Sequence, residues 1–374
     1  MGLYIGIAIV SCALAFGREK TESTVPGSRG KAASRLFLAL LYLVLFIPAA
    51  LRQATGNDYL RYVSFFHLAS VDAYVPTEPG FNALAKLVYH LAGYENYLLL
   101  FAIYAGATIA LFLLSIHLLS DSFAFSFFLF MAFGLYFQCY NTVRYYLALS
   151  MALVALYFFL QREYIPFLAL VLSAALFHKS VLVVLVLYPL CRIPWKMGQR
   201  IVFTGLGAVF FATRSFWLKL AVKLYPSYEG SAILAAGGSI TWSGILRCAA
   251  CLILLFLCLR ISGHRADDLA GPHRFYANAA FLSLWIYVFA SFIPELSRIC
   301  YYLTATQIFL IPKTLELVPK EEKNLKTGLT FLVIAAAVLY FAAFLLRADD
   351  PTVRILPYSS FLFSDLPAYT PPDQ

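Results

Sequence analysis

Long apolar segments alternate with short polar linkers along almost the whole chain. We place apolar segments at residues 1–17, 36–51, 97–119, 122–140, 142–160, 164–177, 179–191, 201–217, 243–260, 275–293, 299–312 and 328–346. Most have about the 17–25 residues that a helix needs to cross a bilayer. Because the bilayer offers no water to backbone polar groups, such segments must be helical. The pattern predicts an all-α polytopic membrane protein, a single domain over residues 1–374, with about 12 transmembrane helices (range about 10–13).

The composition agrees with a membrane protein. The 374 residues are 62% hydrophobic and 13% charged, whereas soluble domains are about 25% charged. The net charge of +9 is not gathered in a polar region with interleaved aromatic residues, so nucleic acid is not expected as a partner. The seven cysteines lie in or beside apolar segments, and the Cys248–Cys251 pair has no second pair near it. We therefore expect packed cysteines, with no metal and no cofactor.

Lys and Arg residues are concentrated in alternate linkers. These linkers are residues 18–35, 161–163, 192–200, 260–274 and 313–326. The positive-inside rule places them in the cytoplasm, so that both termini lie outside. The first apolar segment is expected to be a retained helix, because Arg18 and Lys20 follow it rather than precede it. The long loop 52–96 and the tail 347–374 are then extracytoplasmic, and we expect the end of the tail to be mobile.

The stretch 163–191 allows two interpretations. Its apolar body from Ile165 to Cys191 is interrupted only by His178 and Lys179. A single helix would be about 40 Å long, too long to span a bilayer without tilting. Two short helices bent at His178 would return the chain to the cytoplasm, as Arg162 and Arg192 require. We favour this bent pair; one long tilted helix would reverse the orientation of everything that follows.

Polar residues collect on the predicted outer side. The loop 52–96 is much longer than a simple connection and has too many aromatic residues to be disordered. It carries Arg52, Asp58, Arg61 and Glu78. A long loop with this many polar groups is therefore expected to be partly structured and functional.

Arg144 begins an apolar helix, on the same face as Asn141 and Tyr145. A cation in mid-membrane costs about 2.5–3.5 kcal/mol on insertion scales, so it usually faces a cavity or a partner. The alternative is an arginine that extends to the outer interface. Arg144 is therefore a candidate for binding an anion.

Two further groups of polar residues share this side. His178 and Lys179 interrupt an apolar stretch; a lone histidine is often structural, but the adjacent lysine favours a function. Arg298 and Tyr301 share a helix face with Glu295, and Glu295–Arg298 could instead be a simple ion pair at a helix end. Guanidinium groups bind phosphate oxygens, and tyrosines suit sugar faces and the membrane interface. The outer side is therefore predicted to bind a lipid phosphate and hydroxylated sugars.

Four short motifs occur in order along residues 36–190. They are Arg52…Gly56-Asn57-Asp58-Tyr59…Tyr62, Glu78-Pro79-Gly80-Phe81, Asn141-Thr142-Val143-Arg144 and Phe177-His178-Lys179-Ser180. In order and spacing they resemble the EpsG-like branch of the Wzy-type polysaccharide polymerases. The C-terminal half is similar only in hydropathy and at Ser297-Arg298. Tyr145 departs from the family pattern, in which a glutamine often follows the arginine.

The resemblance implies an enzyme of the bacterial inner membrane. Such enzymes join oligosaccharide repeat units of O-antigen or exopolysaccharide, carried on undecaprenyl diphosphate, by glycosyl transfer at the outer leaflet. The resemblance also implies that a flippase and a chain-length regulator of the same pathway act beside it. Fold analogy suggests a relative of the C-type membrane glycosyltransferases (GT-C), with Asp58 as the counterpart of their outer-loop carboxylate.

The reaction needs cations for the departing diphosphate and a base for the acceptor hydroxyl. We assign the cations to Arg144 and Arg298, with Arg52 or Arg61 assisting and Lys179 holding phosphate. His178 is the expected base, because histidine titrates near pH 6.5, with Asp58 and Glu78 as alternatives. Asn141, Tyr145 and Tyr301 are expected to contact substrate. The other functions that fit are a lipid-linked oligosaccharide flippase or transporter and a membrane O-acyltransferase of a glycan.

Overall fold

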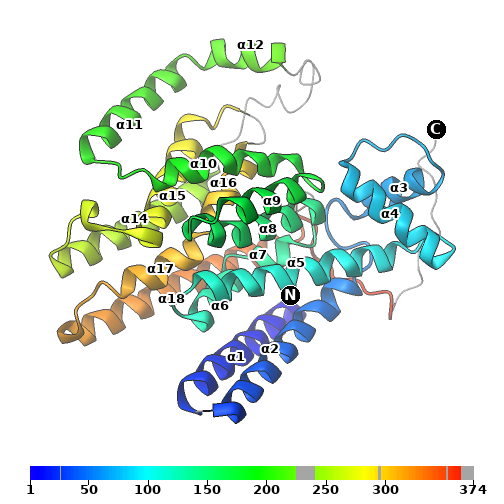
Figure 1. The fold of residues 1–374 in the computed structure, drawn as a ribbon, viewed down its shortest axis with the longest axis horizontal. Coiled ribbons are helices and arrows are strands. Elements are labelled where there is room, and N and C mark those ends of the chain that lie inside the picture. Colours follow the sequence, from blue (N-terminus) through cyan, green and yellow to red (C-terminus); the bar gives the residue numbers. More distant parts are fainter. Residues whose placement is uncertain (26, 225–240, 294–295, 351–352, 364–374) are drawn as a thin grey trace. The chain divides into compact units, whose positions relative to one another are not determined.

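The computed structural model describes the chain except for residues 26, 225–240, 294–295, 351–352 and 364–374. In the described part the named elements are all helices, joined by short connections (Figure 1). The chain forms two compact units: residues 1–182 with 330–374, and residues 183–329. This division does not test whether the two units form one membrane domain, so the single membrane domain stays a prediction.

The first unit is built around long apolar helices. Its elements are α1 (Gly2–Thr24), α2 (Gly27–Ala50), α3 (Tyr59–Ser70), α4 (Pro79–Ala92), α5 (Tyr97–Leu119), α6 (Phe123–Ala132), α7 (Leu135–Gln138), α8 (Val143–Leu160), α9 (Tyr164–Ala175) and most of α18 (Lys323–Leu346). Helices α1 and α2 form a hairpin, α5 packs against α2 and α8, and α8 packs against α9. Asn96 caps α5 by accepting a hydrogen bond from the Leu99 N–H at 2.9 Å.

The predicted outer loop 52–96 is a helical hairpin rather than an extended connection. Pro79 begins α4, and Gly93 ends it with φ of 73°. Aromatic side chains of α3 and α4, among them Tyr62 and Phe81, form a buried cluster with Phe101 and Tyr104 of α5. The loop is therefore partly structured, as expected, and this cluster holds its polar residues against the helices of the first unit.

The second unit contains shorter helices. Its elements are α10 (Val184–Arg192), α11 (Met197–Ala212), α12 (Arg214–Leu224), α14 (Trp242–Ser262), α15 (Gly271–Phe289), α16 (Leu296–Thr304), α17 (Gln307–Leu315) and the start of α18, with the short 3₁₀ turns η3 (Ala266–Asp268) and η4 (Lys320–Glu322). Buried Asn278 of α15 ties the end of α10 in place by donating to the carbonyl oxygens of Cys191 and Ile193. All seven cysteines are free, and five of them are buried.

The helices agree with a multi-pass membrane protein, although fewer of the described helices than expected are long enough to cross a bilayer unbroken. Six helices of the described chain are long and apolar enough to cross a membrane, or seven if α11 and α12, bent by 72°, form one span. Several predicted segments are broken: Gly134 separates α6 from α7, and α16 ends before α17 begins. About twelve crossings are therefore not confirmed, because length alone does not show whether a broken apolar segment spans the bilayer.

The predicted bend at His178 is present. Helix α9 ends at Ala175, and the 3₁₀ helix η1 (Lys179–Val183) follows. The alternative of one long helix over this stretch is wrong.

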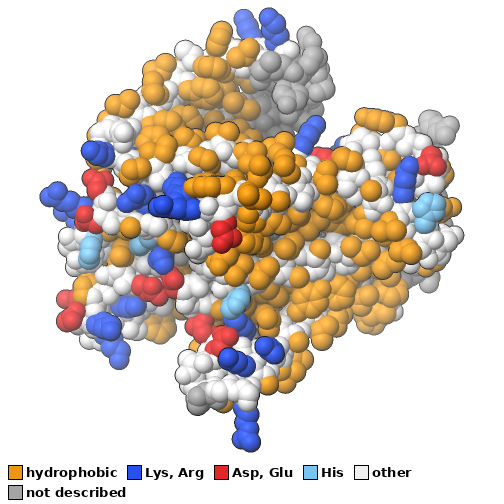
Figure 2. Space-filling view, viewed as in Figure 1, with side chains coloured by type: hydrophobic (Ala, Val, Ile, Leu, Met, Phe, Trp, Pro, Cys, Tyr) orange, Lys and Arg blue, Asp and Glu red, His pale blue; other side chains and the backbone are white. Residues whose placement is uncertain are grey.

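Apolar side chains occupy much of the face shown in Figure 2, and charged side chains gather where α1 joins α2. These charges lie at one of the linkers predicted to be cytoplasmic.

The described part of the C-terminal tail is packed against the protein. Helix α18 ends at Leu346, and residues 353–363 return to the segment after α2. Arg52 and Ser360 form an isolated antiparallel β-bridge. The expected mobile end, residues 364–374, lies outside the described residues.

Candidate functional site

An ion pair joins two segments of the candidate site. Glu78 directly precedes α4, and Arg144 lies in the first turn of α8. Arg144 Nη1 donates a hydrogen bond to Glu78 Oε2 across 66 positions of the chain. The other carboxylate oxygen accepts from the backbone N–H of Lys179 at 3.2 Å. Both side chains are 14% exposed, so Glu78 balances the charge of Arg144 where three distant segments meet.

Aromatic rings surround the Arg144 guanidinium. Its central carbon lies 5.5 Å from the ring centre of Tyr62 and 5.7 Å from that of Phe81. Burial raises the pKa of Tyr62, and the nearby positive charge of Arg144 partly opposes this rise. The low polarity around Arg144 strengthens its attraction for an anion.

Gly80 allows the start of α4 to approach the end of α9. Its N–H donates to the Leu176 carbonyl oxygen at 2.8 Å. A Cβ atom at this position would lie 2.6 Å from the same oxygen, closer than real contacts allow. Any larger residue at this position of the Glu78-Pro79-Gly80-Phe81 motif would therefore clash with the end of α9. The glycine allows Glu78 to reach the Lys179 backbone.

His178 lies in the same cluster as Arg144. The His178 and Tyr145 rings meet edge to face, with centres 5.3 Å apart, and Tyr145 is the neighbour of Arg144 in the chain. His178 Nδ1 is 2.7 Å from Ser180 Oγ. The structure thus brings together Glu78, Arg144, His178 and Lys179, which we call the Arg144 cluster. Their roles in a reaction stay predictions.

Asn141 connects the loop after α2 to the start of α8. Its Oδ1 accepts a hydrogen bond from the Asn57 N–H at 2.8 Å. Gly56 has φ of 104°, and a Cβ there would lie 2.2 Å from the Tyr140 carbonyl oxygen. Asp58 follows, partly exposed, and its charge contributes to the raised pKa of Tyr62. Asp58 therefore lies near the aromatic wall of the Arg144 cluster.

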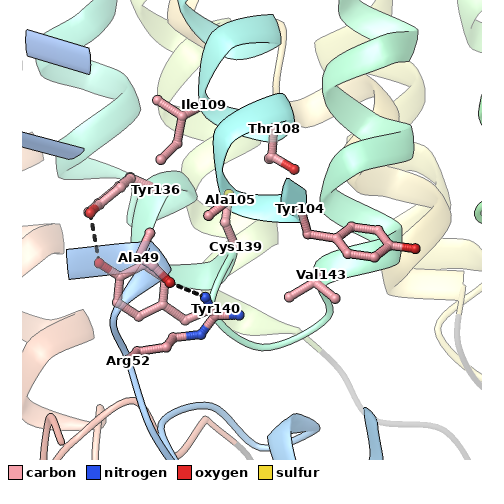
Figure 3. A pocket seen from close by; sticks show the side chains of 10 residues that line it. All are labelled: Ala49, Arg52, Tyr104, Ala105, Thr108, Ile109, Tyr136, Cys139, Tyr140 and Val143. Carbon is pink, nitrogen blue, oxygen red and sulfur yellow. Dashed lines mark hydrogen bonds between the residues drawn. The ribbon is translucent and has the colours of Figure 1, made fainter. Parts of the chain in front are cut away.

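Arg52 occupies a separate pocket of the same unit (Figure 3). The side chain is 1% exposed, and Nη1 donates to the Ala49 carbonyl oxygen. Nε and Nη2 are buried without a hydrogen-bond partner, and no described carboxylate forms an ion pair with this group. The guanidinium lies 4.9 Å from the Phe101 ring centre and 5.2 Å from that of Tyr140. Burial lowers the pKa of Arg52, because desolvation disfavours its charged form.

One aromatic wall separates the Arg52 pocket from the Arg144 cluster. The Phe101 ring, which contacts Arg52, lies 6.3 Å from the ring of Tyr62, which contacts Arg144. Tyr104 lines the Arg52 pocket, and its ring lies 6.2 Å from that of Phe81. The pocket has a volume of only about 10 Å³, enough for about one water molecule. Arg52 therefore acts on its surroundings through its charge more than through an open binding surface.

The sequence also matches a known protein family. Residues 35–360 match the model of the EpsG family. The chain belongs to the EpsG family. No curated protein and no solved structure gives a match. Membership of the EpsG family indicates a multi-pass membrane protein of polysaccharide biosynthesis, a polymerase of glycosyltransferase type. The match extends well beyond residue 190, where the short motifs end.

Other predicted residues of this EpsG-family chain lie elsewhere. Arg61 is exposed on α3, with its guanidinium 5.4 Å from the Phe65 ring centre. Arg298, which is exposed, and Tyr301 lie on α16 of the second unit, and Glu295 lies outside the described residues. Whether Arg298 joins the Arg144 cluster stays a prediction.

Two groups were missed from the sequence. Arg247 is 8% exposed in the apolar helix α14, and its only sequence signal was a lone arginine near one end of an apolar segment. The pairing of Glu78 with Arg144 was also missed, since nothing in a single sequence links the two positions. Among the described residues, no group of three or more His, Cys, Asp or Glu side chains could hold a metal ion.

Proposed function

We propose that this EpsG-family chain joins oligosaccharide repeat units carried on undecaprenyl diphosphate. The reaction takes place at the outer leaflet of a bacterial inner membrane, with both termini outside. One lipid-linked chain is the donor and another lipid-linked unit is the acceptor. A relation to the GT-C glycosyltransferases, about twelve crossings, and a flippase and chain-length regulator as partners belong to the same proposal.

The observation that carries the proposal is the Arg144 cluster. Glu78, Arg144 and Lys179 come from segments up to 101 positions apart, yet they make direct contacts, with His178 beside them. A cation in an aromatic setting, next to a histidine, suits a phosphate and a hydroxyl nucleophile.

The transfer breaks the bond between the anomeric carbon and the diphosphate oxygen. The electron pair leaves with the diphosphate, and Arg144, with Lys179, stabilises this developing charge. The acceptor hydroxyl forms the new bond to the anomeric carbon and gives its proton to a base. His178 is the first candidate for this base and Asp58 the second.

The contacts of Glu78 change the role that we assign to it. Both of its oxygens accept hydrogen bonds, one from Arg144 and one from the Lys179 backbone. A carboxylate with both oxygens occupied by these donors is poorly placed to take a proton from an acceptor hydroxyl. Glu78 is therefore proposed to position Arg144 rather than to serve as the base.

The decisive experiment is elongation by the purified protein. Detergent-purified chain is mixed with a radiolabelled lipid-linked repeat unit, and the products are separated by size. A ladder of longer lipid-linked products is expected. A flippase forms no glycosidic bond, and an O-acyltransferase instead transfers label from an acyl donor to the glycan. Either of those outcomes, without a ladder, overturns the proposal.

A further inference from the structure

The C-terminal residues 353–361, which we call the C-terminal strap, pack along the segment 51–56. Three backbone hydrogen bonds join them: Gln53 N–H to the Ser359 carbonyl at 2.9 Å, Gly56 N–H to the Arg354 carbonyl at 2.8 Å, and Phe361 N–H to the Leu51 carbonyl at 3.1 Å. Both segments belong to the first unit. The strap therefore adds an extended chain beside the residue that carries the buried guanidinium.

Side chains reinforce this pairing. Thr55 Oγ1 accepts from the Ser359 N–H at 3.1 Å, and Ser360 Oγ donates to the Leu51 carbonyl at 3.0 Å. Tyr358 Oη donates to the Pro48 carbonyl at 3.0 Å. Tyr4 of α1 donates to the Ile355 carbonyl from the other side, and Ile355 is fully buried. The strap is thus fixed at several points along its length.

The segment 51–56 needs such support, because it contains no helix turn of its own. Ala54 and Gly56 both have positive φ, at 49° and 104°. A buried guanidinium without an anionic partner is unfavourable, and turning it outward to water would relieve this penalty. Contacts that fix the backbone on both sides of Arg52 oppose that movement. The strap supplies them on one side, and the turn at Tyr140–Asn141 supplies them on the other.

We propose that the C-terminal strap is a positioning element that keeps the Arg52 cation in its pocket beside the Arg144 cluster. This inference rests on the proposed function, in which that charge favours binding of the lipid diphosphate. The strap touches Arg52 through the backbone and does not itself contact the Arg144 cluster in any described hydrogen bond. Its influence on the reaction therefore passes through Arg52.

The test is a double-mutant cycle on the affinity of the purified full chain for undecaprenyl diphosphate. The strap variant is Tyr358→Phe with Ser360→Ala, which removes two hydroxyl donors. We expect the strap variant to weaken binding about tenfold, and Arg52→Gln to weaken it about tenfold. The combined variant should be weakened about tenfold as well, because both changes remove the same effect. Tyr164→Phe with Ser23→Ala, which removes two exposed hydroxyl groups outside the strap and its partner segment, is the matched control and should bind as the wild type does.

Two outcomes overturn the inference. One is unchanged binding in the strap variant; the other is about a hundredfold loss in the combined variant, which would show that the strap acts independently of Arg52. If the wild type itself neither binds the diphosphate nor elongates its substrate, the proposed function fails instead.

Discussion

Arg144 and Arg52 are two guanidinium groups of the same unit, each lying against aromatic rings, but their charges are balanced differently. Arg144 is 14% exposed and paired with Glu78. Arg52 is 1% exposed; its Nη1 donates to the Ala49 carbonyl oxygen, and no carboxylate among the described residues pairs with it. A partly exposed arginine can contact a phosphate directly, in competition with its carboxylate partner. An unpaired buried arginine instead provides a fixed positive potential, at the expense of stability.

This difference suggests two kinds of contribution to one site. Arg144 is suited to direct contact with the substrate, whereas Arg52 is suited to act through the aromatic wall of Phe101 and Tyr62. Removing the two groups should therefore affect different measurements. The predictions below separate direct contact from background charge, starting with the largest effect.

Arg144→Ala should abolish elongation, with a loss of about 10³-fold or more, because it removes the cation proposed to stabilise the leaving diphosphate. The measurement is the rate of ladder formation at equal protein level. Lys86→Ala is the matched control: Lys86 is an exposed cation on α4 whose carboxylate partner is exposed Asp72. Normal polymer length from the Arg144 variant would remove this residue from the mechanism.

His178→Ala should lower the elongation rate by about 10²–10⁴-fold, the usual contribution of a general base. The acidic limb of the pH–rate profile should disappear with it, because protonation of the base no longer limits the rate. Asp58→Asn is the companion variant. If it causes the larger loss and His178→Ala remains fully active, Asp58 is the base.

Glu78→Gln tests whether Glu78 positions Arg144 or accepts a proton. The glutamine amide keeps an oxygen that can accept from the Lys179 N–H. The substitution removes the negative charge that competes with phosphate for Arg144. We expect less than about a tenfold loss of rate, well below the loss of a base, and an unchanged or tighter affinity for undecaprenyl diphosphate. A loss as large as that of His178→Ala would restore Glu78 as a candidate base.

Much of the helix pattern could be predicted from the sequence. The apolar segment predicted at 97–119 coincides with α5, because a polar Asn96 cap and Ser120 bound an uninterrupted apolar run. The bend at His178 was also predicted, because a helix through this stretch would exceed the bilayer thickness. Local hydropathy determines such features, and hydropathy can be read directly from a single sequence.

Other features depend on contacts between distant residues. The pairing of Glu78 with Arg144 and the packing of the strap on residues 51–56 join positions 66 to about 300 apart in the chain. Backbone hydrogen bonds, which carry no side-chain signature, hold the described part of the tail, whereas the end predicted to be mobile lies outside the described residues. The short motifs contain all four residues of the Arg144 cluster, but they do not show that the Glu78 carboxylate is paired with Arg144.

The smallest expected effect is on stability, and here the two arginines should differ in sign. Arg52→Met removes a buried charge that has no carboxylate partner among the described residues and roughly keeps the side-chain volume, so it should raise the midpoint of thermal unfolding in detergent by about 2–4 °C. Arg144→Met leaves the Glu78 carboxylate without its cation and should lower the midpoint by a similar amount. Arg52→Met should nevertheless bind the diphosphate more weakly, since its stabilising change removes the positive potential. If both variants are destabilised equally, the Arg52 charge is compensated in solution and the contrast between the two sites does not hold.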